Sequence, residues 1–213
     1  MSKIKTSIKQ RVKIAFIAIT LLVLSSCQSL KSSDSAEINQ SMQFDITTLE
    51  AKLNKLDNWT ASGVIGIRYN GKADSANYVY NQNGDDFSIK LYGPLGIGSI
   101  EIKGNDKKVT FIDNKGVETQ ADNVKSLMMQ QLGWYVPVDG LKSWVKGMPV
   151  SAKYTNRQMD HNNLTQKFLE KGWEIDYSGY KMFDGGYPLP TKVKMTRDDL
   201  SLKIIVKSWV IAK

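Results

Sequence analysis

From Trp59 onward, apolar residues recur at every second position in short segments, and this pattern constrains the fold more than any other feature. In the first segment Ile65, Ile67 and Tyr69 alternate with smaller or polar residues, which places them on one face of a β-strand. Similar segments cover residues 77–82, 87–91, 98–103, 109–113, 117–120, 173–177, 193–195 and 200–206. The gaps between the earlier segments are too short for parallel crossovers, so the sequence predicts a meandering antiparallel sheet.

Helical periodicity appears at three places. Leu49, Leu53 and Leu56 follow a possible capping box formed by Thr47 and Glu50, which predicts an amphipathic helix starting near residue 45. Two more helices are predicted between the two groups of strands. The first has apolar positions Val124, Leu127, Met128 and Leu132 and ends at Gly133, and the second has Leu141, Trp144 and Val145 and ends at Gly147. Residues 164–169 fit either a helix or a strand.

The first 26 residues have the pattern of an export signal. Five basic residues between positions 3 and 13 precede an apolar stretch, 14–24, of 11 residues, about half of the roughly 20 that a membrane-spanning helix needs. The stretch ends in Leu24-Ser25-Ser26-Cys27, which is similar to the lipobox of bacterial lipoproteins. This resemblance implies cleavage after residue 26 and lipidation of Cys27. The alternatives are a spanning helix and an incidental cysteine.

Removal of the signal lowers the net charge of the chain. The whole chain has a formal net charge of +8, whereas residues 27–213 carry 24 basic and 21 acidic residues, a net charge of +3. The basic balance therefore gives little support to nucleic-acid binding, and no nucleic-acid partner is expected. Cys27 is the only cysteine, so the fold must rest on its apolar core. We expect a flexible tether over residues 27–41 and one domain over 42–213.

Few residues suggest catalysis. His161 is the only histidine and lies in a polar run, 157–163, which favours a loop. The acidic pairs Asp85-Asp86 and Asp198-Asp199 lie in turn contexts where carboxylates are usually solvated, and no nucleophile-elbow or phosphate-loop motif occurs. We therefore predict a protein that is not an enzyme and uses no metal or cofactor. Carboxylate catalysis, with Asp85 or Asp86 in an anchored hydrolase, stays open.

Aromatic and thioether side chains are abundant. The chain has five Trp, nine Tyr and eight Met residues, and Met128, Met129 and Met148 cluster around the two predicted middle helices. Core packing explains any one of these residues. However, flexible thioethers also suit a surface that adapts to apolar ligands, and a curved sheet covered by short helices can enclose one. The composition thus raises the hypothesis of a cavity for lipid or acyl chains.

Several motifs in order resemble the LolB family, the outer-membrane lipoprotein receptors of Gram-negative bacteria. They are Tyr92-Gly93-Pro94-Leu95-Gly96, the segment 132–138 with Leu141, Trp144 and Gly147, the segment 172–177 with Tyr180, Leu189-Pro190, and Trp209. The resemblance implies an open, incomplete antiparallel β-barrel, mainly β with short helices over its mouth, that encloses an apolar cavity. It also implies that residues 164–169 form a strand.

The resemblance further implies partners and location. Receptors of this family take lipoproteins from a periplasmic carrier, LolA, bind the cargo's acyl chains and insert them into the lipid of the outer membrane. We expect a monomer, anchored in the outer membrane with its domain facing the periplasm. Gln28, and not Asp, follows the lipidated cysteine, which favours outer-membrane sorting. The alternatives are a lipid-anchored scaffold lipoprotein and a lipid carrier without an insertion role.

Site residues follow from the alternation and the resemblance. Candidate lining residues of the acyl cavity are Ile65, Ile67, Tyr78, Tyr80, Leu91, Met128, Trp144 and Trp173. The alternation does not decide which face of the sheet is concave. In the family, the leucine of the Pro-Leu-Gly loop protrudes and delivers cargo to the membrane, which makes Leu95 the predicted insertion residue. The alternative for Leu95 is a loop leucine folded back on the core.

Overall fold

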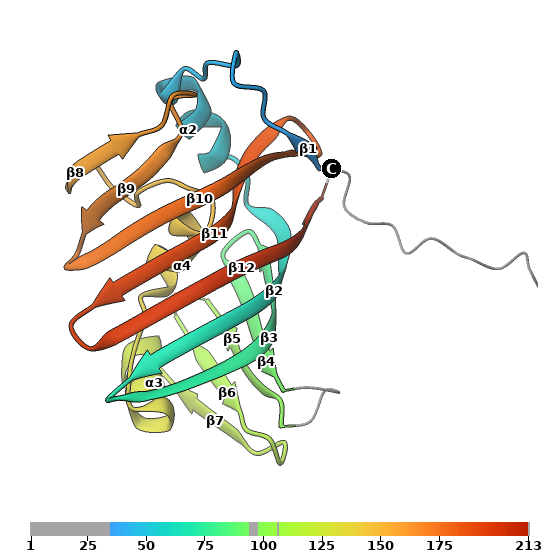
Figure 1. Cartoon of the computed structure of the whole chain (residues 1–213). Coiled ribbons are helices and arrows are strands. Elements are labelled where there is room, and N and C mark those ends of the chain that lie inside the picture. Colours follow the sequence, from blue (N-terminus) through green and yellow to red (C-terminus); the bar gives the residue numbers. More distant parts are fainter. Residues whose placement is uncertain (1–34, 94–97, 106, 213) are drawn as a thin grey trace, which may run out of the picture. The chain divides into compact units, whose positions relative to one another are not determined.

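A computed structural model describes residues 35–93, 98–105 and 107–212, and these form a curved antiparallel sheet with helices α2, α3 and α4 packed against it (Figure 1). The predicted lipidation site Cys27 and the predicted insertion residue Leu95 lie outside the described residues. Within them, no helix is long and apolar enough to cross a membrane.

The strands fall into two groups that correspond to the two groups of alternating segments. The first group is β2 (Asn58–Tyr69), β3 (Lys72–Asn83), β4 (Asp86–Tyr92), β5 (Ile100–Gly104), β6 (Val109–Ile112) and β7 (Glu118–Ala121). The second group is β8 (Tyr154–Met159), β9 (Thr165–Glu170), β10 (Trp173–Phe183), β11 (Tyr187–Arg197) and β12 (Leu200–Ile211). Residues 164–169 thus belong almost entirely to a strand, as the resemblance implied.

Pairing between β12 and β2 joins the two groups into one sheet. The order is β7-β6-β5-β4-β3-β2-β12-β11-β10-β9-β8, every pairing is antiparallel, and Ile204 lies opposite Ile65. The sheet does not close, since β7 and β8 form its two ends. The predicted fold class, an open and incomplete antiparallel barrel with short helices, is confirmed. β8 was not expected from the sequence.

Local sequence explains the turns and the curvature. Asn70 and Gly71 have φ of 49° and 73°, the left-handed conformation that suits a tight turn between β2 and β3. Farther along, a Cβ on Gly63 would lie 1.9 Å from the carbonyl oxygen of Ile205. This close approach coincides with a register shift in β12 between Val206 and Ser208. Glycine therefore allows the two central strands to bend sharply.

The helices have clear boundaries. In α2 (Ile46–Asn54), the N-cap is Asp45, whose carboxylate accepts a hydrogen bond from the Thr48 backbone N–H at 2.7 Å. The predicted capping box of Thr47 and Glu50 is therefore wrong. The helix α3 (Val124–Leu132) is capped by the Asn123 side chain and ends at Gly133, whose φ is 78°. The third helix is α4 (Val138–Trp144), with Pro137 as its N-cap.

Two prolines mark a place where the sheet divides. Pro188 and Pro190 lie in β11 opposite Met182 and Tyr180 of β10. Pairing of β11 with β12 begins only at Lys192, while β12 continues alone with β2 as far as Ile211. Proline has no backbone N–H to donate, so it is tolerated in this part of β11, which pairs with β10 but not with β12. The sequence predicted a strand over residues 193–195 only, and in the structure this strand, β11, is much longer.

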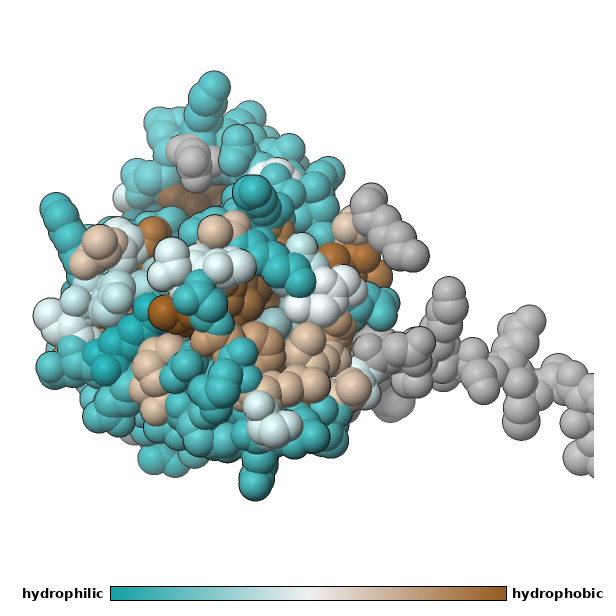
Figure 2. Space-filling model, turned by 90° about the horizontal axis from the view of Figure 1, so that it is seen from above, coloured by the Kyte–Doolittle hydropathy of each residue, from teal (hydrophilic) through white to brown (hydrophobic). Residues whose placement is uncertain are grey.

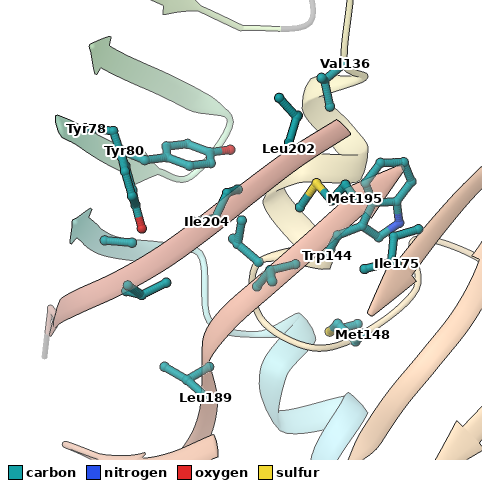
Figure 3. Packing of buried hydrophobic residues seen from close by; sticks show 14 of the residues in the cluster. Tyr78, Tyr80, Val136, Trp144, Met148, Ile175, Leu189, Met195, Leu202 and Ile204 are labelled. Atoms are coloured by element: carbon teal, nitrogen blue, oxygen red, sulfur yellow. The ribbon is translucent and has the colours of Figure 1, made fainter. Parts of the chain in front are cut away.

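The hydrophobic core lies between the sheet and the helices. Figure 3 shows Tyr78 and Tyr80 of β3 and Leu202 and Ile204 of β12 on the side of the sheet that faces Trp144 of α4. Figure 2, which looks at the domain from above, shows apolar side chains in the middle of the visible surface and hydrophilic ones around them. The concave face is thus the one that carries the alternating apolar residues.

The chain contacts the domain before α2 begins. The short strand β1 (Ala36–Glu37) pairs with β10, with Ala36 opposite Met182, and the Glu37 carboxylate lies 2.7 Å from the Lys181 ammonium group. The buried Asn162 amide donates hydrogen bonds to the backbone oxygens of Asn39 at 3.0 Å and Met42 at 2.6 Å. Ala36, Glu37 and Asn39 lie inside the segment predicted as a tether, residues 27–41, and Met42 follows it directly.

Candidate functional site

The structure places all eight candidate lining residues in the apolar core between the concave face of the sheet and the helices, or at its edge. Tyr78, Tyr80, Met128, Trp144 and Trp173 are buried. Ile65, Ile67 and Leu91 are half-buried and pack against the core. The eight residues therefore divide into a deep group and a group closer to solvent.

The deep group is centred on two tryptophans. The rings of Trp144 and Trp173 lie 5.9 Å apart, and both side chains are fully buried. The Trp144 indole N–H donates a hydrogen bond to Glu170 Oε2 at 2.8 Å. Packing and this hydrogen bond fix Trp144 in one orientation. This part of the core is filled by protein side chains.

Glu170 holds the segment after α4 against the end of β9. Its carboxylate accepts hydrogen bonds from the backbone N–H of Val150 at 2.9 Å and of Ser151 at 3.0 Å, and from the Ser151 hydroxyl at 3.1 Å. Together with the Trp144 indole, these donors surround a side chain that is only 2% exposed. Hydrogen bonds to a carboxylate are stronger than those between neutral groups, so Glu170 fixes the position of Trp144 and the chain that follows it.

The two tyrosines of β3 lie in an apolar environment. The Tyr80 hydroxyl donates to Gln82 Oε1 at 3.1 Å, and its ring contacts Trp59 with centroids 4.6 Å apart. The Tyr78 hydroxyl is buried and has no hydrogen-bond partner among the described residues. Burial raises the pKa of both phenols well above the ordinary value. Both side chains therefore stay neutral at physiological pH, and each contributes an apolar ring with a polar hydroxyl group at its end.

An open pocket lies at the solvent edge of the concave face. It has a volume of about 400 Å³, within the usual range for ligand pockets. The apolar side chains that line it are Ile67, Ala76, Leu91, Ile100, Leu132 and Trp134. Asp74, Ser75, Tyr92, Gly93 and Gly98 also line it. The half-buried candidates Ile67 and Leu91 thus meet in one pocket, bounded by β2 to β5 and by the end of α3.

Sequence reasoning predicted only Ile67 and Leu91 of this pocket and missed, among others, its three other large aliphatic or tryptophan side chains. Ile100 lies opposite Leu91 in the β4–β5 pairing, so the alternation in both strands could have identified it. Leu132 and Trp134 flank Gly133, where α3 ends, and only the tertiary fold brings them to the sheet. A larger depression of about 480 Å³ is lined mainly by Asn, Asp, Ser, Lys and Thr side chains, which do not suit an apolar ligand.

The candidate catalytic residues are scattered. Asp85 and Asp86 are exposed near the β3–β4 turn, where Asp86 accepts a hydrogen bond from the Asn105 amide at 2.9 Å. His161 is exposed between β8 and β9. In the described part of the chain, no group of three or more His, Cys, Asp or Glu residues is placed to hold a metal ion. None of the three side chains lies in the apolar pocket.

Comparison with known proteins identifies the family. Residues 57–209 match the family model described as outer membrane lipoprotein LolB. The chain belongs to the LolB family. The matched range begins just before β2 and ends within β12, so it includes both groups of strands and the pocket. LolB is an outer-membrane lipoprotein family concerned with lipoprotein localisation, and it is not a known enzyme family.

Individual relatives agree with this assignment. The chain is 47% identical over 211 residues to the outer-membrane lipoprotein LolB of Francisella tularensis subsp. novicida (strain U112), covering 99% of this chain and 100% of the relative. It is 30% identical over 199 residues to the LolB of Pseudomonas paraeruginosa (strain DSM 24068 / PA7), covering 93% and 96%. A DUF1329 family protein from Desulfovibrio piger is 8% identical, with a TM-score of 0.51 over 78% of this chain and 90% of that chain, and shares the fold.

Proposed function

We propose that this LolB-family protein is a lipoprotein receptor that accepts acylated cargo from a LolA-like periplasmic carrier and inserts it into the outer membrane. The observation that carries the proposal is the apolar pocket of about 400 Å³ at the solvent edge of the concave face. Two residues expected to line an acyl cavity, Ile67 and Leu91, lie there together. Membership of the LolB family supports the same role.

The energetics of acyl chains favour a shielded route. Leaving water is worth about 0.8 kcal/mol per methylene, so a chain of about fourteen carbons gains on the order of 10 kcal/mol. Such a chain cannot cross an aqueous space exposed. Transfer runs downhill if the receptor binds the chain more tightly than the carrier does and less tightly than the bilayer does. The receptor then needs neither ATP nor a catalytic residue, and we propose that it is not an enzyme.

One side of the site is rigid, and the other can adapt to its ligand. Trp144, held by Glu170, provides a fixed boundary at the closed centre of the core. The other boundary is α3, which packs on β6 and β7 and carries Met128 and Leu132. Thioether and leucine side chains change rotamer easily, so this wall can adapt to cargo chains of different length. We therefore propose that the chain enters at Ile67 and Leu91 and extends beneath α3.

The anchor and the insertion residue complete the proposal. Cys27 carries the acyl chains that hold the protein in the outer membrane, with the domain in the periplasm. Leu95 enters the bilayer during release. Gly93 and Gly98, the described residues on either side of the segment that contains Leu95, both line the pocket.

The test is transfer of an acylated lipoprotein from a purified carrier to variants of this chain. Ile67→Asp and Leu91→Asp add a carboxylate to the apolar part of the pocket, and each should weaken acyl uptake at least tenfold because an unpaired carboxylate resists contact with hydrocarbon. The matched control is Val210→Asp, since Val210 is 59% exposed near the end of β12 and lies outside the pocket. Normal uptake by folded Ile67→Asp and Leu91→Asp proteins would contradict the proposed site.

A further inference from the structure

The outer face of the sheet carries a cluster of exposed basic residues, which we name the basic face: Arg68, Lys192, Lys194 and Lys203. They lie on the neighbouring strands β2, β11 and β12, on the side opposite the apolar core. Lys194 is directly opposite Lys203, and like charges in such cross-strand pairs repel each other. Within the described part of the chain, none of the four forms an ion pair.

Two acidic residues, Asp74 and Asp176, lie beside this cluster, and within the described residues neither forms an ion pair with its four cations. Asp176 of β10 lies opposite Lys194, but its carboxylate contacts the ammonium group of Lys167 at 3.7 Å. The same Lys167 also binds Glu174 at 2.9 Å. The basic face therefore keeps its positive charge, at a cost in folding stability that binding of an anionic partner would offset.

The shape of the basic face suits phosphate groups. A depression of about 420 Å³ is lined by three cations, Arg68, Lys194 and Lys203, by one carboxylate, Asp74, and by Gly66, Ile67, Ala73, Thr196 and Ser201. Its cations and hydroxyl groups are the donors that bind phosphate oxygens. Beside it, Ile205 lies opposite Lys192 and is 46% exposed, which is unusual for isoleucine in a central strand. Cations around an exposed apolar side chain are typical of surfaces that contact lipid headgroups and the hydrocarbon below them.

The length of the anchoring segment gives an independent argument. β1 fixes Ala36 beside Met182, near the end of β10, whereas the pocket lies toward the other end of the strands, near the β2–β3 turn. β2 alone, with 12 residues, extends about 40 Å between these ends. The nine residue steps from Cys27 to Ala36 span at most about 30 Å. If the strands stand perpendicular to the membrane, the pocket therefore cannot reach the bilayer while β1 stays paired with β10.

We propose that the basic face docks on anionic phospholipid headgroups, so that the domain lies with its strands along the membrane. This proposal rests on the proposed function in one respect, the lipid anchor at Cys27. In this orientation β1 and the pocket edge both come within reach of the bilayer, and the concave side stays open to the carrier. A lipid partner explains the charge better than an acidic carrier does, because the carrier must hand over its cargo at the pocket, on the other side of the sheet.

The experiment measures the depth of single fluorophores in the lipidated mature protein. Cys27 is the only cysteine of the chain, so Ile205→Cys provides one free thiol for bimane once Cys27 is acylated. Met129→Cys is the matched control, because Met129 is 47% exposed and lies on α3, on the opposite side of the sheet. Both proteins are placed in phosphatidylcholine vesicles with or without phosphatidylglycerol, together with a lipid that carries a spin label at its headgroup.

We expect quenching at Ile205 to be at least threefold stronger than at Met129 when phosphatidylglycerol is present. Each lysine near an anionic surface contributes a factor of about five, so Lys194→Gln with Lys203→Gln should lower the equilibrium constant for docking about 25-fold. Lys107→Gln with Lys153→Gln, which changes two exposed lysines outside the basic face, should have no effect. Melting curves verify the fold of each variant.

Three results would overturn the proposal. The first is equal quenching at the two positions. The second is quenching at Ile205 that does not depend on phosphatidylglycerol or on the two lysines. The third is a change at Ile205 that appears only when an acidic carrier protein is added, which would assign the basic face to that partner. A second bimane on Cys27 would instead show that the anchor is absent, so the two failures are distinguishable.

Discussion

Replacing Glu170 by Gln should destabilise the domain far more than its similar shape suggests. Oε2 accepts from the Trp144 indole and the Val150 backbone, and Oε1 accepts from the backbone and hydroxyl of Ser151. An amide keeps only one acceptor oxygen, so its NH₂ group must face two donors. The Ser151 hydroxyl can rotate to accept, but its backbone N–H cannot. One partly buried donor is left without a partner and the remaining bonds lose their charge assistance, which together cost about 2–3 kcal/mol.

Thermal and urea unfolding followed by tryptophan fluorescence measure this cost. For a domain of this size, about 2–3 kcal/mol corresponds to a fall in Tm of roughly 5–10 °C. Glu174→Gln is the control, because Glu174 forms a half-exposed ion pair with Lys167 at 2.9 Å, and such pairs are worth about 1 kcal/mol or less. If the two variants lose the same stability, the carboxylate of Glu170 does not hold Trp144 in the way described.

Three further perturbations test other parts of the structure. Lys146 donates to the backbone oxygens of Leu53 at 2.7 Å and Leu56 at 3.0 Å, and burial lowers its pKa to about 8 from 10.5. Between these pH values the unfolded chain then binds more protons than the folded chain. The free energy of unfolding, measured relative to that of Lys146→Met, should therefore rise by about 3 kcal/mol from pH 8 to pH 10.5. A difference in stability between the two proteins that does not change with pH would refute the low pKa. Asn162→Ala should speed hydrogen exchange in residues 36–44 while the rest of the domain is unchanged, and unaltered exchange would show that the amide does not hold this segment. Leu95→Glu should leave acyl binding intact and block release into liposomes, since a carboxylate resists entry into hydrocarbon; unchanged release by the folded variant would exclude Leu95 as the insertion residue.

The sequence predicted the sheet where one face of a strand is buried. Apolar residues alternate over most of β2, β4 and β12, because the inner residues of these strands pack in the core and most of their outer residues face solvent. β8 escaped prediction because Tyr154–Met159 lies at the end of the sheet, lacks apolar alternation and has register shifts after Thr155 and Gln158. Its pairing is decided by β9, which a pattern within β8 does not reveal.

The site was predicted only in part, for a related reason. Alternation identified Ile67 and Leu91, and the structure brings both to the pocket. It gave no way to separate them from Trp144 and Trp173, which have the same apolar character but lie in the closed centre of the core. The difference depends on Glu170 and on how far the helices cover the sheet. Both depend on contacts between segments far apart in sequence.

The central claim is that cargo acyl chains occupy the pocket on the concave face. The most direct measurement is photocrosslinking with a lipoprotein whose acyl chain carries a diazirine, loaded on a LolA-like carrier and mixed with this protein. We expect crosslinks to peptides that contain Ile67, Leu91 or Trp134, which line the pocket together. Transfer of the cargo with crosslinks only to peptides outside the pocket would contradict the proposed binding site, and a complete failure of the folded protein to take cargo from the carrier would contradict the proposed function.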